Sequence, residues 1–467
     1  MKIVFIHYHL KPGGVTTVIQ QQAQSLEKTD VLIITGDRAD THLPFQTVII
    51  EALKYDQEID HHLPPQDTAD QIAEAIHQHW PEGCDLIHVH NPTLAKNRDF
   101  LNILSQLQQK GFRLLLQIHD FAEDGRPQSY FAAPYPADCH YAVINQRDYN
   151  ILVTAGLSET GLHQIPNSVT PIDPKTSDPG NTVVYPIRAI RRKNIGEAVL
   201  LSLFFANQER LAFTLPPNSP VDIAPYEDWK QFVLDHRLNV EFDIGLKAEF
   251  PQILADSSWV LTTSIMEGFG FSFLEPWLAG KQLWGRKLPA ICQDFEQKGI
   301  MLNHLYEKIK IPLPWIGRDR LSSIWEKAIV RSCRQFEYSI SQDQLQNTFA
   351  SMTAGDQVDF GLLNETFQKE IIERLAFEPA DYNVLISLNP FLSRPGPPEE
   401  GSEDLIRNNS QMIRDHFNSD LYSNQLLEVY QAVINTPIQH QIDKKRLISS
   451  FLEMESLSLL KWGPYSG

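Results

Sequence analysis

Two glutamates flank a glycine turn in residues 261–280, which read LTTSIMEGFGFSFLEPWLAG. Residues 259–262 are short, apolar and β-branched, which predicts a buried strand, and the glycines after it predict a turn before a helix that opens at Ser272. Such a turn lets the backbone approach a ligand, and the free N–H groups of a helix N-terminus attract phosphate. Glu267 and Glu275 can accept hydrogen bonds from sugar hydroxyls. The stretch therefore suits the diphosphate and the hydroxyls of a nucleotide-sugar.

A purely structural interpretation of the same stretch is a capping box. Ser272 and Glu275 have the spacing S-x-x-E, so Glu275 could serve only to cap its own helix. Glu267 would then be an ordinary loop carboxylate. Residues elsewhere in the chain are needed to separate the two interpretations, because short motifs have many false positives.

Length and charge limit the class of protein. The 467 residues exceed the roughly 250–300 at which single cores stop growing, so two domains with an extension are expected. The 58 acidic and 40 basic residues give a formal charge of −18, which disfavours nucleic acid and anionic lipid as partners. No apolar run approaches the length of about 20 residues that spans a membrane, and the N-terminus lacks a signal-peptide pattern. We expect a cytoplasmic protein without a transmembrane segment.

The sequence does not predict a metal site. The four cysteines are far apart and form no C-x-x-C pair, so they are expected to be reduced and structural. Histidines alternate along two predicted strands, as His7 with His9 and as His88 with His90, which places each pair on one side of a sheet. Metal ligands can have this spacing, but so can strands that end at a polar crevice. No supporting set of cysteines or carboxylates accompanies the histidines.

Strand and helix patterns alternate through the first part of the chain. Strand patterns cover 2–7, 31–35, 47–50, 85–90, 114–119 and 141–144, and helix patterns cover 16–26, 68–79 and 97–110. This alternation predicts a Rossmann-like domain at 1–168, with helices on both faces of a parallel sheet. Gly13 and Gly14 lie at the first strand-to-helix junction, which is either a ligand contact or simply a tight turn. His119 and Asp120 end a strand, where an imidazole either bonds a sugar or reacting group or is merely solvated.

A second α/β domain is expected after a linker. Residues 169–181 are rich in Pro, Asp, Ser and Thr, which predicts the linker. The next strand pattern, 183–187, runs directly into a basic turn that suits a diphosphate or is merely solvated. Its four cations are Arg188, Arg191, Arg192 and Lys193. Strand patterns at 211–215, 240–243 and 258–262 and a helix pattern at 249–255 complete the domain at 182–285.

The last third of the chain is mostly helical in pattern. The clearest helices of an insert at 286–410 are 321–336 and 362–375, and a Pro/Gly/acidic loop is expected at 389–404. A closing helix and tail occupy 411–467, with helical patterns at 405–417 and 422–434. The insert has no function assigned by its motifs. It could shape an acceptor pocket, cap a cleft or form an oligomer contact.

Five signals in one order resemble the retaining glycosyltransferases of family 4, which have the GT-B fold. They are Gly13-Gly14-Val15, His119-Asp120, Pro166-Asn167-Ser168-Val169, Arg188 with Lys193, and Glu267-Gly268-Phe269-Gly270 with Glu275. The resemblance covers 1–285 and 417–434. It implies two Rossmann-like domains facing a central cleft, a nucleoside diphosphate-sugar as donor, and neither a metal nor another cofactor.

The resemblance also implies roles for single residues. Arg188 and Lys193 would hold the donor diphosphate, and Glu275 would take the ribose hydroxyls. Glu267 would bind the transferred sugar, and His119 would contact that sugar near the reacting carbon. The rest of the implied donor site is Gly13, Gly14, Gly268, Phe269, Gly270, Phe271 and Ser272, with Gly14 giving a backbone contact near the phosphates.

Two residues depart from the family pattern. Ser168 stands where glycine is usual, and Pro276 stands where a helix former is usual. Because proline removes an early backbone hydrogen bond, the helix is expected to start a residue or two after Ser272. Neither change removes a charge that the chemistry needs.

The expected activity is that of a retaining hexosyltransferase that acts on a hydroxyl acceptor. The acidic charge favours a small soluble acceptor over a membrane lipid. One alternative is a GT-B sugar phosphorylase, in which phosphate replaces the nucleotide. Another is an inactive binding protein that acts through 286–410, although an inactive copy would be free to lose the charges at Glu267, Glu275, Arg188 and Lys193.

Overall fold

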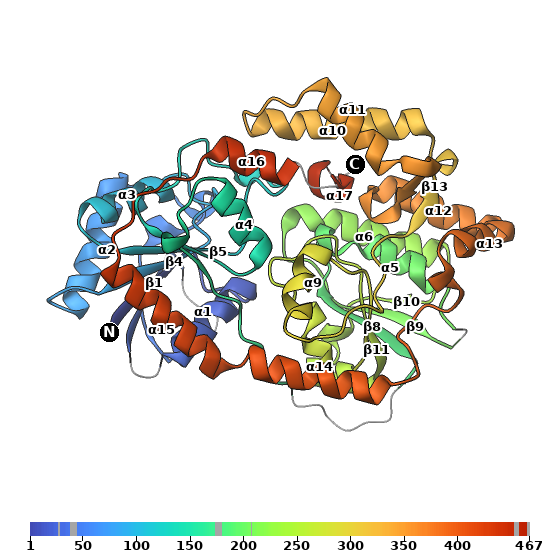
Figure 1. Cartoon of the computed structure of the whole chain (residues 1–467), viewed down its shortest axis with the longest axis horizontal. Helices are drawn as coiled ribbons and strands as arrows, with labels where there is room; N and C mark the ends of the chain where they lie inside the picture. The colour runs from blue at the N-terminus through green and yellow to red at the C-terminus, as the bar shows by residue number, and fades with distance from the viewer. Residues whose placement is uncertain (27–28, 38–43, 173–179, 207, 453–456, 465–467) are drawn as a thin grey trace. The chain divides into compact units, whose positions relative to one another are not determined.

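The computed structural model describes residues 1–467 except 27–28, 38–43, 173–179, 207, 453–456 and 465–467 (Figure 1). The chain divides into two compact units. The first consists of Met1–Ser168, Gln335–Tyr338 and Phe417–Glu453, and the second of Val169–Arg334, Ser339–His416 and Met454–Gly467. Most of the linker expected at 169–181 lies outside the described residues.

The first unit is built on a seven-stranded sheet in the order β3-β2-β1-β4-β5-β6-β7. Its strands are β1 (Lys2–His7), β2 (Asp30–Thr35), β3 (Gln46–Ile49), β4 (Leu86–His90), β5 (Leu114–Ile118), β6 (His140–Val143) and β7 (Leu162–Gln164). Every neighbouring pair is parallel. The inner strands β4, β5 and β6 are buried along their whole length, as expected for a parallel sheet covered on both faces. The predicted parallel α/β sheet is confirmed.

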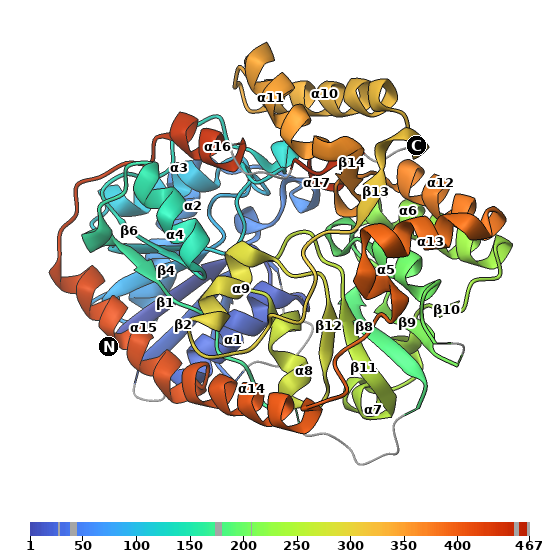
Figure 2. The ribbon, with the colours of Figure 1, turned by 45° about the vertical axis from the view of Figure 1, so that its right-hand side comes forward.

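Helices from both ends of the chain cover this sheet. They are α1 (Gly14–Ser25), α2 (Pro65–His79), α3 (Phe100–Gln109), α4 (Gln146–Thr154), α15 (Ser419–Asn435) and α16 (Lys444–Leu452), with 3-10 turns η1 (Glu51–Leu53), η2 (Asp56–Glu58), η3 (Pro127–Ser129) and η4 (Glu159–Gly161). Figures 1 and 2 both show α15 alongside α1. Leu426 and Tyr430 of α15 are fully buried in the sheet's core. Burial of a side chain such as Leu426 contributes about 1.5–3 kcal/mol, so apolar packing anchors the closing helix to this unit.

The second unit is built on a five-stranded parallel sheet in the order β10-β9-β8-β11-β12 (Figure 2). Its strands are β8 (Thr182–Arg188), β9 (Arg210–Leu215), β10 (Val240–Glu241), β11 (Ser257–Thr262) and β12 (Leu283–Gly285). The helices and turns within it are η5 (Arg191–Lys193), α5 (Ile195–Ser202), α6 (Pro220–Asp235), η6 (Ile244–Leu246), α7 (Phe250–Asp256), η7 (Phe271–Phe273) and α8 (Glu275–Leu278).

The insert is mostly helical, as expected, and adds one small antiparallel ladder between β13 (Lys310–Pro312) and β14 (Gln357–Asp359). Its helices are α9 (Pro289–Glu296), α10 (Arg318–Gln335), α11 (Gln342–Met352), α12 (Glu365–Phe377), α13 (Pro379–Leu388) and α14 (Ser402–His416), followed near the C-terminus by α17 (Leu459–Trp462). Its 3-10 turns are η8 (Leu313–Trp315), η9 (Ala354–Asp356), η10 (Phe360–Leu362) and η11 (Pro390–Ser393). The loop expected at 389–404 is thus interrupted by η11 and by the start of α14.

A buried ion network fastens the insert to the second sheet. Arg286 follows β12 and donates to both carboxylate oxygens of Glu197 at 2.6 and 2.7 Å, and to both of Asp359 at 2.7 and 2.8 Å. Tyr306 donates to Glu197 at 2.7 Å. Glu197 lies on α5 and Asp359 on β14, so the network spans the sheet layer and the insert. Removal of one partner would leave a buried charge uncompensated, which is strongly destabilising.

Two negative findings concern the described part of the chain only. None of its helices combines the length and the apolar character that a membrane crossing requires. Within the same residues, no group of three or more His, Cys, Asp or Glu side chains could hold a metal ion.

Candidate active site

Charged side chains gather at one edge of the second sheet. Arg188 is the last residue of β8, Lys193 ends the η5 turn after it, and Glu267 follows the neighbouring strand β11. Lys193 Nζ lies 2.5 Å from Glu267 Oε1, and the two side chains are only 15% and 9% exposed. Glu275 opens α8 and lies close enough for the charges of Lys193 and Glu267 to act on its carboxyl group. These four residues, Arg188, Lys193, Glu267 and Glu275, are called the charged cluster below.

Hydrogen bonds between the two loops fix the position of Lys193. Its carbonyl oxygen accepts hydrogen bonds from Tyr185 at 2.9 Å and from the hydroxyl of Thr263 at 3.1 Å. The backbone N–H of Ile265 donates to the carbonyl of Arg192 at 3.0 Å. Each such bond stabilises the fold by about 0.5–1.5 kcal/mol. The β8 and β11 loops therefore hold one another in a single arrangement.

The two carboxylates of the charged cluster have opposite pKa shifts. Burial alone would raise the pKa of Glu267, but the positive charges of Lys193 and Arg192 and hydrogen bonds from Lys193 and Ser264 lower it below its usual value. Burial raises the pKa of Glu275; the charge of Lys193 opposes this shift and that of Glu267 adds to it. Glu267 is therefore held as a carboxylate, whereas Glu275 accepts a proton more readily.

Arg188 keeps most of its donors available. Its Nη1 atom donates to the carbonyl oxygen of Pro216 at 3.1 Å. No described carboxylate forms an ion pair with it. A guanidinium has five N–H donors in a fixed fork, so several of them remain for an anionic ligand.

The capping box suggested by the sequence is not formed. Residues Phe271–Phe273 make a 3-10 turn, and α8 begins at Glu275 rather than at Ser272, with no side-chain cap. The helix therefore starts three residues after Ser272, later than expected. Pro276 occupies the second position of α8, where its missing N–H costs nothing. Ser272 Oγ is buried without a hydrogen-bond partner among the described residues.

The late start also corrects the expected source of anion attraction. A helix of four residues, Glu275–Leu278, sums only a few peptide dipoles, so its N-terminus attracts phosphate weakly. Positive potential at this edge must come mainly from side chains. Of these, Lys193 is already paired, whereas Arg188 forms no ion pair within the described part of the chain.

The glycine turn itself has a steric requirement for glycine. Gly270 has φ +96°, and an added Cβ would lie 2.9 Å from Phe273 and 3.1 Å from Ile291. Phe269 is 6% exposed and packs against Phe295 of α9 at a ring distance of 5.6 Å. Its side chain thus belongs to the core. The expected donor-site residues on this loop are Glu267, Gly268, Phe269, Gly270, Phe271, Ser272 and Glu275.

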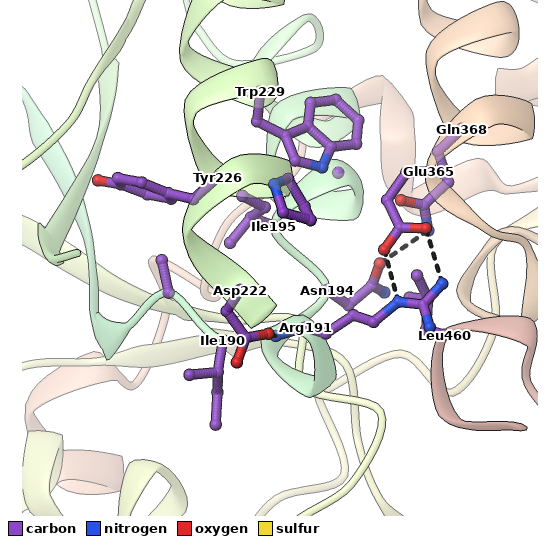
Figure 3. Close-up of a pocket in the computed structure, with 13 residues that line it drawn as sticks. Ile190, Arg191, Asn194, Ile195, Asp222, Tyr226, Trp229, Glu365, Gln368 and Leu460 are labelled. Carbon is purple, nitrogen blue, oxygen red and sulfur yellow. Dashed lines mark hydrogen bonds and ion pairs between the residues drawn. The ribbon is translucent and has the colours of Figure 1, made fainter. Parts of the chain in front are cut away.

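The outer side of the η5 turn is held by the insert, a contact that the sequence did not indicate. Arg191 forms a two-pronged ion pair with Glu365 of α12, at 2.6 and 2.9 Å (Figure 3). Gln368, one helical turn further on, donates to Asn194 Oδ1 at 2.8 Å. These residues line the small pocket of Figure 3, whose empty volume is about 310 Å³. The Arg191 side chain therefore binds the insert rather than a diphosphate.

The first unit has a glycine junction at the start of α1. Gly13 precedes the helix and Gly14 is its first residue. An added Cβ at Gly14 would meet nothing within 4 Å, and at Gly13 it would meet only the carbonyl oxygen of Lys11, at 3.9 Å. Packing within the protein therefore does not require glycine at either position.

His119 follows β5 and is tied to its neighbours. Its Nε2 lies 3.0 Å from Nδ1 of His90, and the rings stack with an interplanar angle of 12°. The backbone N–H groups of His119 and Asp120 both donate to Asn91 Oδ1, at 2.9 and 3.0 Å. His90 and Asn91 therefore fix both the ring and the backbone of His119.

Burial keeps the histidines of this sheet uncharged. It lowers the pKa of His119 to about 4 and those of His7 and His88 to about 3, and it lowers the pKa of His90 well below the usual value. These four residues, His7, His88, His90 and His119, are called the histidine cluster below. His88 is bonded to the hydroxyl of Tyr430, 2.9 Å away on α15. The cluster offers hydrogen-bond donors and acceptors without charge near neutral pH.

Comparisons with known proteins identify relatives of the whole chain. No family model matches. The chain is 27% identical over 432 residues to mannosylglucosyl-3-phosphoglycerate synthase of Petrotoga mobilis, covering 83% of each protein. Among solved structures it resembles sucrose-phosphate synthase of Thermosynechococcus elongatus, with a TM-score of 0.53 and 16% identity over 92% of this chain and 98% of that one. It also resembles Anabaena HepE in complex with UDP-glucose, with a TM-score of 0.54 and 14% identity over 92% and 98%.

The structural likenesses extend over both sheets of the chain and agree with its own topology. Each half is an open parallel α/β sheet, and C-terminal helices follow the second one. This is the fold expected from the five motifs. The chain has the GT-B fold and is a retaining glycosyltransferase that depends on a nucleotide-sugar.

Proposed function

We propose that the charged cluster binds the nucleoside diphosphate-sugar and that its cations act on the leaving diphosphate. Lys193 and Arg188 contact the diphosphate, Glu275 takes the ribose hydroxyls and Glu267 binds the transferred hexose. The observation that carries this proposal is the 2.5 Å pair between Lys193 and Glu267 at the ends of two adjacent parallel strands. Ligands of open α/β sheets bind at such ends.

The roles follow from where charge develops. As the bond from the anomeric carbon to the phosphate oxygen breaks, the sugar becomes oxocarbenium-like and the diphosphate gains negative charge. A preplaced ammonium and guanidinium stabilise that charge without reorganisation. The acceptor oxygen then bonds to the same face of the sugar, and its proton passes to the departing phosphate. The carboxylate of Glu267 keeps Lys193 oriented and accepts hydroxyl donors of the hexose.

The residues of the first unit complete the proposed site. His119 contacts the hexose near the reacting carbon as a neutral hydrogen-bonding group, and Gly13 and Gly14 let backbone N–H groups approach the phosphates. The open space beside both glycines supports this role, because a side chain would occupy the ligand's volume.

We further infer a small, soluble acceptor and a cytoplasmic site of action. The Petrotoga relative is named for a mannosylglucosyl-3-phosphoglycerate product, which is a small soluble glycoside rather than a lipid. HepE was solved with UDP-glucose. UDP-glucose is therefore the first donor to test, with GDP-mannose and ADP-glucose beside it.

Calorimetric titration of the purified protein with UDP-glucose, GDP-mannose and ADP-glucose tests the donor site. We expect one donor to bind selectively. Arg188→Ala should weaken that binding by roughly 10–100-fold, because a hydrogen bond to a charged group contributes about 1.5–3 kcal/mol. Arg210→Ala is the matched control, since Arg210 is half exposed and paired with Glu241 in the same unit.

The same titration has outcomes that would refute the proposal. If no nucleotide-sugar binds, or if Arg188→Ala and Arg210→Ala behave alike, the charged cluster is not the donor site. Release of sugar 1-phosphate from a disaccharide and inorganic phosphate would instead indicate a phosphorylase.

A further inference from the structure

The first unit has a second set of polar residues beside the histidine cluster. Strands β1, β4 and β5 are neighbours in the sheet, and the loops after β4 and β5 contain Lys96 and Arg126. Tyr55 follows β3, and its ring lies 5.7 Å from Lys96 Nζ. The residues are therefore grouped at the carboxyl ends of the strands, where ligands of open parallel sheets bind.

Lys96 differs from the other cations at this edge. Lys11 Nζ is paired with Glu58 at 2.8 Å, and Arg126 Nη2 is paired with Asp120 at 2.8 Å. For Lys96, no carboxylate within the described ranges forms an ion pair, and no oxygen there accepts a hydrogen bond from its ammonium group. Its side chain is partly buried. A cation in this position has lost part of its hydration without gaining an anion in return.

One charge of each sign acts on Lys96, and the positive charge of Arg126 has the larger effect. Burial lowers the pKa of Lys96, and the positive charge of Arg126 lowers it further, whereas the charge of Asp120 acts in the opposite direction. Two cations thus lie near one another, and Asp120 is paired with Arg126 rather than with Lys96. A bound anion would relieve the repulsion between them and replace the lost hydration.

The neighbouring histidine cluster would recognise a different part of the same ligand. His90 and His119 are neutral and can both donate and accept hydrogen bonds. Such groups suit hydroxyls, which need no counter-charge. The edge as a whole therefore combines neutral partners for hydroxyls with two cations for an anionic group.

We propose that the acceptor carries an anionic group, either a phosphate or a carboxylate, and that Lys96 and Arg126 bind this group. This inference rests on the proposed function, because it treats the edge of the first sheet as the acceptor side. Arg126 supplies the guanidinium N–H groups that Asp120 leaves available, and Lys96 supplies a point charge. A neutral oligosaccharide or a simple alcohol would leave both cations without a partner in the ligand.

NMR of Lys96 itself gives the sharpest test. Reductive methylation with ¹³C-formaldehyde labels lysine amines while keeping their charge, and the resonance missing from a Lys96→Met sample identifies Lys96. We expect glucose 6-phosphate or glucuronate to shift that resonance and to raise the pH at which it titrates, whereas glucose should do neither. The anionic sugar that shifts the resonance at the lower concentration shows whether the site prefers a phosphate or a carboxylate. Because the readout is at Lys96, phosphate bound at the charged cluster of the other unit does not contribute.

Unlabelled variants provide the affinity test. In the presence of saturating nucleotide, the wild-type protein should bind the better anionic sugar at least 10-fold more tightly than glucose. Lys96→Met should abolish that preference, and Lys96→Arg should restore much of it. Lys54→Met is the matched control, because Lys54 is similarly buried in the same unit but has a carboxylate partner, Glu51, at 3.5 Å.

Each outcome has a distinct meaning. If Lys96→Met keeps the preference for anionic sugars, or if the Lys96 resonance responds equally to glucose, the inference is wrong and the contact with Tyr55 is only structural. If nucleotide-sugars fail to bind in parallel titrations, the proposed function fails first. Donor binding without any anion effect removes the acceptor inference alone.

Discussion

The carboxyl edges of the two sheets are built alike, but the side-chain pairs at their centres differ in charge. Both are formed by adjacent parallel strands followed by loops. The edge of the second sheet holds the buried ion pair of Lys193 with Glu267, whereas His90 and His119 pair at the edge of the first without charge. On the proposed function this difference has a chemical reason. A departing diphosphate needs fixed charge, and hydroxyls need directional hydrogen bonds.

The largest effect on kcat is expected for substitution of Lys193, and it tests whether fixed charge is needed at the second edge. On the proposed function, Lys193→Ala removes the ammonium from the diphosphate and leaves Glu267 buried without its partner, so kcat should fall roughly 10²–10³-fold, as for loss of one preorganised donor. Glu267→Gln should cost less, because an amide still accepts hydrogen bonds. Steady-state kinetics of both variants and of the double variant measure the coupling.

The double variant is the informative member of that cycle. If the two side chains act as one unit, it should be no slower than Lys193→Ala. Strictly additive losses would mean that the residues work independently. Lys247→Ala is the control, since Lys247 is 66% exposed in the same unit; a comparable loss there would remove the special role of Lys193.

A second large effect is expected at acidic pH, where the two units should lose stability at different pH values. The folded-state pKa values of His7 and His88 are about 3 and that of His119 is about 4, all lowered by burial from the usual 6.5. Below pH 6.5 the unfolded chain binds protons that the folded first unit does not, so its stability falls as pH decreases. Each such histidine contributes about 1.4 kcal/mol per pH unit.

Within the charged cluster, Glu267 should respond later. The pKa of Glu267 is lowered below 4.5, so the stability that this carboxylate contributes is present above pH 4.5 and is lost only as pH falls below it. Hydrogen exchange at pH 7, 6 and 5 should therefore show amides of β4 and β5 losing protection before those of β8 and β11. Equal loss in both sheets over this range would contradict the contrast. His88→Phe should flatten the response of the first unit.

The sequence predicted the sheets well because their inner strands carry a strong local signal. Strands such as β1 and β5 are runs of apolar and β-branched residues bounded by turn residues, and their limits agree with prediction to within a residue. By contrast, β7 and β12 have three residues each, which is too short for a pattern. Helix α6 was also missed, since Pro225 lies inside it and interrupts the periodicity.

For the site, local motifs indicated residues but not their long-range partners. The S-x-x-E spacing predicted a capping box that is absent, because the chain from Phe271 to Phe273 turns as a 3-10 helix before α8 begins. Glu365 and Gln368 each contact the η5 turn from 174 positions away. No periodicity or spacing connects such residues, and only the folded insert brings them to the turn.

The smallest effect is expected at the contact between the insert and the η5 turn. The histidine cluster is held by residues of its own sheet, and this prediction tests whether the charged cluster needs the insert for support. Gln368 is 1% exposed and donates to Asn194, the residue after Lys193. Gln368→Leu leaves Asn194 Oδ1 without this donor, which costs about 1–3 kcal/mol of stability. Because Tyr185 and Thr263 still hold the carbonyl of Lys193, the turn should loosen rather than unfold, and donor Kd should rise only a few-fold.

Glu370→Gln is the control on the same helix, since Glu370 pairs with Arg320 at the surface. A change in donor Kd for Gln368→Leu, with kcat for bound donor nearly unchanged, indicates that the insert positions the turn. An unchanged Kd with a lowered melting temperature would make α12 a purely structural brace and would leave the charged cluster as self-sufficient as the histidine cluster.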